Sequence, residues 1–227
     1  MSLALVIGAS GGIGAAIVSH LEASGRYRHV IGLSRSSDPA LDLLDESTIA
    51  TAAKSVAAAG TPGLVIDATG ILSDVRMQPE KALRALDPAV MTRSFAINAI
   101  GPALLMKHFL PLFPRDRRSA FATLSAKVGS AADNRLGGWY SYRASKAALN
   151  QLVRTASIEL RRTHPQAICV AIHPGTVATR LSQPFQKSGL EVLTPARAAA
   201  ELIEGLDRIT PGDSGGFFDR HGTPLPF

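Results

Sequence analysis

Short apolar segments alternate with longer segments of helical periodicity along the whole chain. Apolar runs of strand length are Leu3–Ile7, Val30–Leu33, Leu64–Asp67, Ala120–Leu124 and Ile168–Ile172, with Gly216–Phe218 as a closing strand. Apolar positions spaced three or four residues apart predict helices over Ile13–Glu22, Ser47–Ala59, Pro79–Leu86, Pro88–Phe113, Tyr140–Thr163 and Pro195–Leu206. Strands that are apolar throughout and joined by helices indicate a parallel sheet covered on both faces. We therefore expect one α/β domain over residues 1–227, built on a doubly wound parallel sheet.

Composition narrows the class of protein. With 46% hydrophobic and 19% charged residues, the chain is globular, which excludes disordered and fibrous proteins. The single cysteine, Cys169, excludes an intramolecular disulfide, and since no Cys/His cluster has zinc spacing we expect no metal. The first strand has neither the basic region nor the cleavage site of a signal peptide, and no run of 18 apolar residues follows. We expect a soluble, cytoplasmic protein without a membrane partner.

Net charge suggests an anionic ligand but not a nucleic acid. Lysine and arginine exceed acidic residues by 24 to 18, giving a net charge of +6. The densest basic group is Arg115, Arg117 and Arg118, in an expected loop after Pro114. Because no nucleic-acid-reading module accompanies it, we interpret this group as solvated surface and expect no nucleic-acid partner. The overall basicity favours an anionic cofactor.

A glycine-rich turn joins the first strand to the first helix. Gly8, Gly12 and Gly14 are spaced Gly-x-x-x-Gly-x-Gly, which differs from the Gly-x-Gly-x-x-Gly of the standard dinucleotide fingerprint. Such glycines let the backbone approach a pyrophosphate, which the helix N-terminus then holds. A purely structural tight turn is the alternative. The position of this turn at the first strand-to-helix junction favours dinucleotide binding.

The end of the second strand carries Ser34, Arg35 and Ser36. An NAD site would place an acidic residue here for the ribose 2′-hydroxyl, whereas a cation flanked by hydroxyls suits a 2′-phosphate. The sequence therefore favours NADP(H) over NAD(H). Further on, Asp42 is either an acceptor for the adenine amino group or a plain loop carboxylate.

Tyr142 and Lys146 are the candidate reaction centre. A separation of four residues puts the phenol and the ammonium on one helix face. A free phenol has a pKa of about 10, and a nearby cation lowers that pKa by about 1–3 units. Tyr142 is thereby predicted to act as a general acid/base. Tyr140 offers no rival, because Ala144 stands at the equivalent spacing.

Further polar residues follow the later strands or interrupt a helix. Asn98 lies in an apolar helix, where a structural hydrogen bond is the alternative to a functional role. Ser125 follows the fourth strand and is either a strand-end cap or a hydroxyl that polarises a substrate carbonyl. Pro174 and Gly175 force a turn after the fifth strand, at an edge where open α/β sheets bind ligands. His173 is interpreted as structural.

In this order and at these intervals, the motifs resemble the short-chain dehydrogenase/reductase family. The resemblance spans residues 1–180, and the ending Phe218–Pro226 also resembles members. Ser125–Ser130 and Asp133–Tyr140 resemble the bacterial C-factor-like and carbonyl-reductase-like subgroup. The resemblance implies a Rossmann fold, a small-molecule carbonyl or alcohol substrate, and a substrate region near 176–195. It also implies a homodimer or homotetramer that pairs through the helices at Pro88–Phe113 and Tyr140–Thr163.

The resemblance also assigns roles to residues. Tyr142 would protonate the carbonyl oxygen, and Lys146 would hold the nicotinamide ribose and lower the Tyr142 pKa. Ser125 would orient the carbonyl, and Asn98 would support a water-mediated proton relay through Lys146. Besides Asn98, Tyr142 and Lys146, the implied cofactor-binding residues are Gly8, Ser10, Gly11, Gly12, Ile13, Gly14, Ser34, Arg35, Ser36, Asp42, Leu43, Ala68, Thr69, Gly70, Pro174, Gly175, Val177 and Thr179.

The chain departs from the family pattern in three places. The Asn-Asn-Ala-Gly segment stands here as Asp67-Ala68-Thr69-Gly70, so stabilisation of the third strand must differ. The usual Ser-Ser pair is Ser125-Ala126, although its second member is normally the catalytic one. Ser125 lies 17 positions before Tyr142 and Ser130 lies 12 before, so both serines remain candidates. The stretch 181–193 is short, which predicts an open pocket and broad or bulky substrates.

The function that we expect is NADPH-dependent reduction of an aldehyde, ketone or quinone by hydride transfer. One alternative is a regulatory or signalling protein that binds NADP(H) with little turnover. Another is a nucleotide-sugar epimerase or related lyase, which shares the Tyr-Lys pair but needs a larger C-terminal region than the chain has after Arg180.

Overall fold

The fold centres on one sheet of parallel strands. The computed structural model describes residues 3–75, 77–181 and 191–227. Within them the strands are β1 (Leu3–Ile7), β2 (His29–Leu33), β3 (Pro62–Asp67), β4 (Ser119–Leu124), β5 (Ala167–His173) and β6 (Phe217–Asp219). They pair in the order β2-β1-β3-β4-β5-β6, and every pair is parallel. Each strand expected from the sequence is confirmed within two residues at either end.

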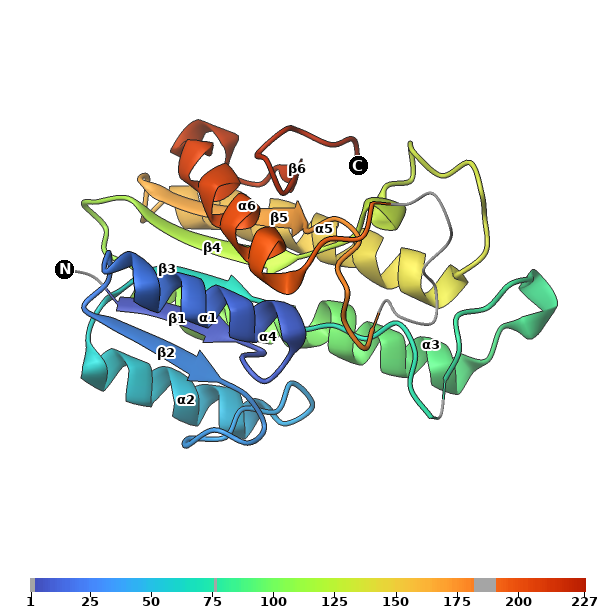
Figure 1. Ribbon diagram of the computed structural model, residues 1–227, viewed down its shortest axis with the longest axis horizontal. Helices are drawn as coiled ribbons and strands as arrows, with labels where there is room; N and C mark the ends of the chain where they lie inside the picture. Colours follow the sequence, from blue (N-terminus) through green and yellow to red (C-terminus); the bar gives the residue numbers. More distant parts are fainter. Residues whose placement is uncertain (1–2, 76, 182–190) are drawn as a thin grey trace.

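Helices cover both faces of this sheet. They are α1 (Gly12–Ser24), α2 (Glu46–Ala59), α3 (Pro88–Phe95), α4 (Gly101–Phe109), α5 (Tyr140–Arg161) and α6 (Pro195–Arg208). Figure 1 shows α1 and α6 crossing the near face of the sheet. The opposite face packs against α2, α4 and α5.

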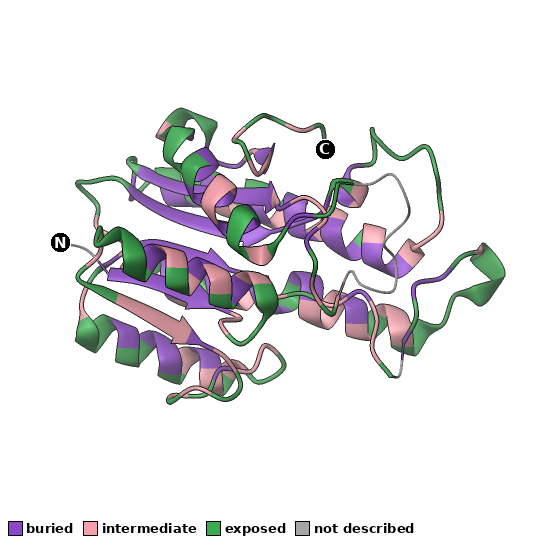
Figure 2. Cartoon of the chain, in the orientation of Figure 1, coloured by how far each residue is buried: buried purple, intermediate pink, exposed green. Residues whose placement is uncertain are grey.

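Alternating strand residues build the two cores. In β1, Leu5 and Ile7 pack with Phe109 of α4 on one side, whereas Val6 packs with Ile17 of α1 on the other. All of these side chains are fully buried, and the strands other than β2 are the most continuously buried part of the cartoon in Figure 2. Burial on both faces explains why the strands are apolar throughout, and it confirms the predicted doubly wound sheet.

The winding of the chain reverses beside β1. From β1 the chain moves outward to β2, then crosses back to β3 on the other side of β1. Ligands of open α/β sheets bind at such a switch point, outside the carboxyl ends of the strands. Here those ends are Ile7 and Asp67, which pair in register.

The glycine-rich turn fits tightly at this point. Gly8 has φ +84°, in the left-handed region that favours glycine. A Cβ on Gly8 would lie 3.0 Å from the Ala68 carbonyl oxygen, and one on Gly14 would lie 2.2 Å from the Gly8 carbonyl oxygen. Any larger residue at position 14 would therefore push the first turn of α1 away from β1.

The prediction of a helix over Pro79–Leu86 is wrong. Only a 3₁₀ turn, Leu83–Ala85, forms there, and Ala82 before it is extended with φ −147°. The reason lies in tertiary contacts of Glu80. Its carbonyl accepts a hydrogen bond of 2.5 Å from the Trp139 amide, and its carboxylate binds Ser141. These bonds hold the segment against the start of α5 in a non-helical conformation.

The predicted helix over Pro88–Phe113 forms, but it is not regular. Between α3 and α4 the chain makes a π-helical segment, Ala96–Ile100, which contains Asn98, and the helix ends in a 3₁₀ turn at Leu110–Leu112. π-helical turns of this kind often accompany functional sites. Taken together, Pro88–Leu112 is the one helix among the described residues that is long and apolar enough to cross a membrane, with a mean hydropathy of 1.3. Its Leu105, Met106 and Phe109 are buried in the core, so the finding is weak evidence for a membrane span.

Candidate active site

Loops from three strands, β1, β3 and β5, meet at the carboxyl edge of the sheet. The β1–α1 turn touches the end of β3 through Gly8 and Ala68. A Cβ on Gly12 would lie 3.0 Å from Thr179 Cγ2, which brings the segment after β5 to the start of α1. A Cβ on Gly70 would lie 3.5 Å from both Asn98 Oδ1 and Lys146 Nζ. The structure thus gathers predicted residues from positions 8 to 179 at the carboxyl edge of the sheet, where open α/β sheets have their ligand crevice.

Helix α5 supplies the predicted reaction centre. Tyr142 and Lys146 are both buried, one turn apart, and Lys146 Nζ donates a hydrogen bond of 2.7 Å to the Leu124 carbonyl at the end of β4. The Tyr142 ring packs against Leu72 and Ala126 and meets Trp139 edge to face at a centroid distance of 6.3 Å. Among the residues that the structure describes, none forms a hydrogen bond with the Tyr142 hydroxyl.

Burial controls the protonation of this pair. It raises the pKa of the Tyr142 phenol above its usual value. It lowers the pKa of Lys146 to about 8. The predicted lowering of the Tyr142 pKa by Lys146 is therefore wrong for this conformation. The Lys146 ammonium donates its hydrogen bond to the Leu124 carbonyl, and burial removes water from the phenol. At neutral pH Tyr142 is a protonated phenol and hence a proton donor.

Asn98 ties three segments together. Its Oδ1 accepts from the Ile71 amide at 2.8 Å, and its Nδ2 donates to the Ile71 carbonyl at 2.8 Å. Nδ2 also reaches Ser94 Oγ at 3.3 Å and Ser145 Oγ at 3.2 Å. The structural hydrogen bonds considered from the sequence are thus present, and they hold the segment after β3 against α5. The proton-relay role stays a prediction.

The side chains of the two candidate serines both form hydrogen bonds with residues other than Tyr142. Ser125 Oγ donates to Asn150 Oδ1 at 2.7 Å, and Ser130 Oγ accepts from the Asp133 amide at 3.1 Å. A hydroxyl has one hydrogen to donate, and that of Ser125 is directed at α5. The residue that packs against the Tyr142 ring is Ala126. This geometry does not support the predicted carbonyl-orienting role of Ser125.

The predicted adenosine end of the site lies after β2. Arg35 is exposed, and no hydrogen bond or ion pair ties its guanidinium to another described residue. Ser34 Oγ lies 3.1 Å from Ser36 Oγ. Asp42 Oδ1 accepts from the Leu44 amide at 3.0 Å, so this carboxylate at least caps its own loop. Leu43 packs against Gly101 of α4, where a Cβ would come within 2.8 Å of the Leu43 Cβ.

The amino end of α1 is open to an anion. Ser10, Gly11 and Gly12 are exposed there, and the first turn of α1 carries no acidic residue. Free amides at a helix N-terminus attract phosphate groups. The neighbouring Ile13 is half-buried and packs against Val177.

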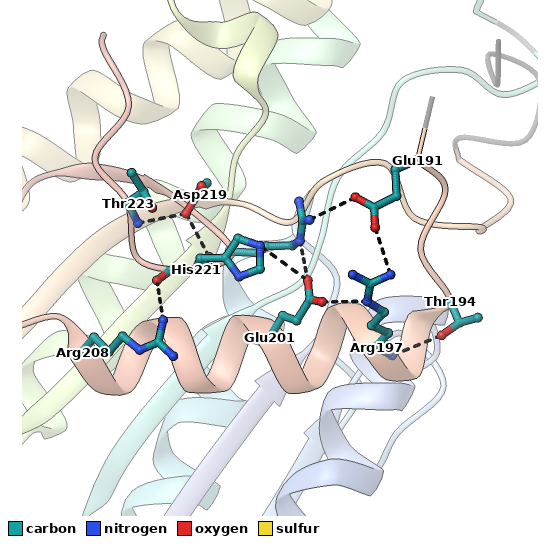
Figure 3. A network of polar contacts seen from close by, with 9 residues as sticks. Glu191, Thr194, Arg197, Glu201, Arg208, Asp219, His221 and Thr223 are labelled. Atoms are coloured by element: carbon teal, nitrogen blue, oxygen red, sulfur yellow. Dashed lines mark hydrogen bonds and ion pairs between the residues drawn. The ribbon is translucent and has the colours of Figure 1, made fainter. Parts of the chain in front are cut away.

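The Arg220 side chain packs against the turn after β5. Gly175 has φ +81°, and a Cβ there would lie 3.1 Å from the Arg220 guanidinium. Arg220 pairs with Glu201 of α6 and with Glu191 at 3.3 Å, within the polar network drawn in Figure 3. This network links the C-terminal turn to the segment that re-enters the described structure at residue 191. Residues 182–190, inside the predicted substrate region near 176–195 and the short stretch 181–193, lie outside the described residues.

His173 directly precedes this turn, and its interpretation as a structural residue stays a prediction. Burial, together with the positive charge of Arg220, lowers its pKa to about 4. Its ring is therefore neutral at pH 7.

Sequence reasoning missed Glu80. This buried carboxylate, 4% exposed, accepts a hydrogen bond of 3.1 Å from the Ser141 amide and a short one from Ser141 Oγ. It thereby caps the start of α5 from another part of the chain, one residue before Tyr142. No local pattern signals a contact between residues 61 positions apart, and the erroneous helix over Pro79–Leu86 concealed it.

Comparisons with known proteins agree with this geometry. Residues 40–189 match the short chain dehydrogenase family. The C-signal protein of Myxococcus xanthus is 39% identical over 147 residues, which cover 64% of this chain and 84% of that protein. A 1-hydroxy-2-glutathionyl-2-methyl-3-butene dehydrogenase of Rhodococcus sp. (strain AD45) is 31% identical over 234 residues and 99% of both chains.

Solved structures show the same fold. An NADPH-bound carbonyl reductase from chicken fatty liver superposes with a TM-score of 0.86 at 27% identity, over 100% of this chain and 98% of that one. The carbonyl reductase Sniffer of D. melanogaster gives a TM-score of 0.85 at 21% identity, over 100% of this chain and 99% of that one. The fold and site define a Rossmann-fold oxidoreductase. The chain belongs to the short-chain dehydrogenase/reductase family, with carbonyl-reductase-like relatives.

We predict that Glu80→Ala lowers the free energy of unfolding by about 1–3 kcal/mol, because it leaves two buried donors of Ser141 unsatisfied. Urea unfolding measures this. Glu159→Ala, an exposed glutamate on the same helix, is the matched control and should change stability by less than about 0.5 kcal/mol. Equal effects of the two substitutions would show that Glu80 does not anchor α5.

Proposed function

We propose that this protein reduces a small-molecule carbonyl compound, an aldehyde, ketone or quinone, with NADPH as the hydride donor. The observation that carries the proposal is the Tyr142 phenol. It is buried and protonated, lies one turn from Lys146, packs with Ala126 just after β4, and has no hydrogen-bond partner among the described residues. The similarity to the chicken carbonyl reductase and to the Rhodococcus dehydrogenase supports the same chemistry.

The residues around the crevice fit a dinucleotide phosphate. Gly8 and Gly14 let the β1–α1 turn pack tightly against its own helix and the end of β3, and the open N-terminus of α1 suits the pyrophosphate. Arg35 offers a cation to a 2′-phosphate. Lys146, beside Gly70, would hold the nicotinamide ribose, and Gly175 and Thr179 would border the nicotinamide. NADP(H) would supply the hydride, while the protein supplies position and protons.

Proton transfer is the task of Tyr142. As the carbonyl carbon accepts a hydride, its oxygen gains negative charge, and the phenol donates its proton to form the alcohol. The phenolate left behind regains a proton from solvent, while the Lys146 ammonium would hold the nicotinamide ribose in place. Because burial favours the neutral phenol, the resting enzyme holds the proton that reduction requires.

We expect Tyr142→Phe to lower kcat for carbonyl reduction by about 10²–10⁴-fold, because it removes the acid and retains the packing. The assay follows NADPH oxidation with a panel of aldehydes, ketones and quinones. NADPH affinity should stay within about threefold, which separates lost chemistry from lost binding. Unchanged turnover in the mutant would remove Tyr142 from the mechanism.

The same assay decides the role of the serines. Ser125→Ala should reduce kcat by less than about tenfold, because the Ser125 hydroxyl donates its hydrogen bond to Asn150 and not to a group beside Tyr142. Ser130→Ala, at the second candidate serine, which is also buried, is measured beside it, and a loss of turnover in Ser130→Ala alone would assign the role to Ser130. A loss of about 10²-fold or more in Ser125→Ala alone would show that its hydroxyl turns to the substrate.

Arg35 is proposed to select NADPH over NADH. Arg35→Ala should weaken NADPH binding by about 10–100-fold, the value of a charge-assisted hydrogen bond, and leave NADH binding within about twofold. Fluorescence titration with each cofactor measures both constants. Arg117→Ala, at an exposed arginine in another loop, should change neither. Equal loss for NADPH and NADH would show that Arg35 does not read the 2′-phosphate.

The assembly is proposed to be a homodimer or homotetramer built on the long helices. Ile100, 54% exposed, and Ile158, 50% exposed, leave apolar surface on these helices that a second copy would cover. Light scattering after size exclusion should give a dimeric or tetrameric mass, and Ile100→Glu with Ile158→Glu should lower it. Leu136→Glu, at an exposed loop residue, is the control. A monomeric wild type would contradict the proposal.

The cytoplasm is the proposed compartment, in keeping with NADPH use and a single buried thiol at Cys169.

The second candidate is an NADP(H)-binding regulator with little turnover. The observation that favours it is the identity to a protein named C-signal. Tyr142→Phe separates the two functions, because a regulator would keep its biological effect without the phenol.

A further inference from the structure

Asp67 is a buried carboxylate that the proposed chemistry leaves without a role. It is the last residue of β3 and is 0% exposed. Its Oδ1 accepts from the Thr69 amide at 3.0 Å and from Thr69 Oγ1 at 2.6 Å, and its Oδ2 accepts from Thr123 Oγ1 at 2.7 Å. All three donors are neutral. Burial raises the pKa of Asp67 above its usual value, whereas these hydrogen bonds and the positive charge of Lys146 oppose that rise.

Lys146 is a buried cation close to Asp67, and burial disfavours its charged form as well. Lys146 is buried, with 3% of the residue exposed. Its ammonium donates a hydrogen bond of 2.7 Å to the Leu124 carbonyl. Leu124 directly follows Thr123, which pairs in register with Asp67 across β3 and β4. Consecutive residues of one strand therefore hold the carboxylate and the ammonium.

Other charged groups around Lys146 are accounted for. The buried carboxylate Glu80 is bonded to Ser141, at the start of α5. Lys127, in the 3₁₀ turn that packs on α5, is exposed and pairs with Asp133 at 3.6 Å. The other groups near Lys146 are neutral: Asn98 from the π-helical segment, Gly70 after β3, and the Tyr142 phenol one turn earlier on α5.

We propose that Asp67 is a positioning residue that acts through Lys146, as the buried countercharge that keeps its ammonium protonated and so sets the upper pH limit of catalysis at this site. The inference rests on the proposed function for its kinetic consequence, but the charge pairing is independent of it. Burial lowers the pKa of Lys146 to about 8, and the negative charge of Asp67 opposes that lowering. Reaction requires the ammonium, so activity falls as pH rises through the Lys146 pKa, and removal of the Asp67 charge moves that fall to lower pH.

The test compares two nearly isosteric variants. Asp67→Asn removes the charge, whereas Thr123→Val removes a hydrogen bond to the same carboxylate and leaves the charge. In profiles of kcat against pH, the alkaline limb of Asp67→Asn should move down by about one pH unit, and that of Thr123→Val should stay within about 0.3 unit. Equal shifts in the two variants, or no shift in Asp67→Asn, would overturn the proposal.

Two NMR titrations make the test independent of turnover. With ¹³Cε-labelled lysine, the signal lost in Lys146→Arg should titrate at lower pH in Asp67→Asn than in wild type. With ¹³Cγ-labelled aspartate, the Asp67 carboxyl of the wild type should stay ionised from pH 6 to 9, a result that needs no folded Asp67 variant. A Lys146 midpoint that does not move, or an Asp67 protonated at pH 7, would overturn the countercharge even in an active reductase. An absence of reductase activity with both titrations as expected would instead contradict the proposed function alone.

Discussion

The close approach of three backbone segments at Gly8, Gly14 and Ala68 is the constraint on which the site depends. A Cβ at Gly14 would come within 2.2 Å of the Gly8 carbonyl oxygen, so only glycine lets α1 start directly against β1. The same turn presses on the end of β3, beside the place where the winding of the sheet reverses. The N-terminus of α1 and the polar residues after β3 therefore border one crevice, where a dinucleotide would bind.

Hydrogen bonds from outside α5 then position the reactive residues in that crevice. Asn98 joins the π-helical segment to Ile71 and to Ser145, and Glu80 holds the first turn of α5 through Ser141. Lys146 donates a hydrogen bond to the Leu124 carbonyl at the end of β4. The Tyr142 phenol itself packs against apolar side chains. Hydrogen bonds thus hold the segments around Tyr142 in place, while burial removes water from its phenol. This burial raises the pKa of Tyr142, so the phenol keeps its proton and can donate it to a substrate.

Local patterns predicted the sheet, the glycine turn and the Tyr142–Lys146 spacing, because each depends on residues close together in sequence. They failed for contacts between distant segments. Pro79–Leu86 has helical periodicity, but the bond from the Trp139 amide to Glu80 overrides it. The spacing also did not reveal the hydrogen bond from Ser125 to Asn150, and the carbonyl-orienting role of Ser125 stays a prediction. The side to which a strand-end residue points depends on the exact end of β4, which composition and spacing do not determine.

The most direct test of the account is the fate of the hydride. NADPH carrying deuterium at C4 of the nicotinamide would be incubated with the protein and an aldehyde or ketone that it turns over, and the alcohol product would be examined by NMR. We expect one deuterium on the carbinol carbon of the alcohol, since the hydride comes from C4 of the nicotinamide. NADPH binding without deuterium transfer to any member of the carbonyl panel would contradict a reductase and favour a regulatory, cofactor-binding protein.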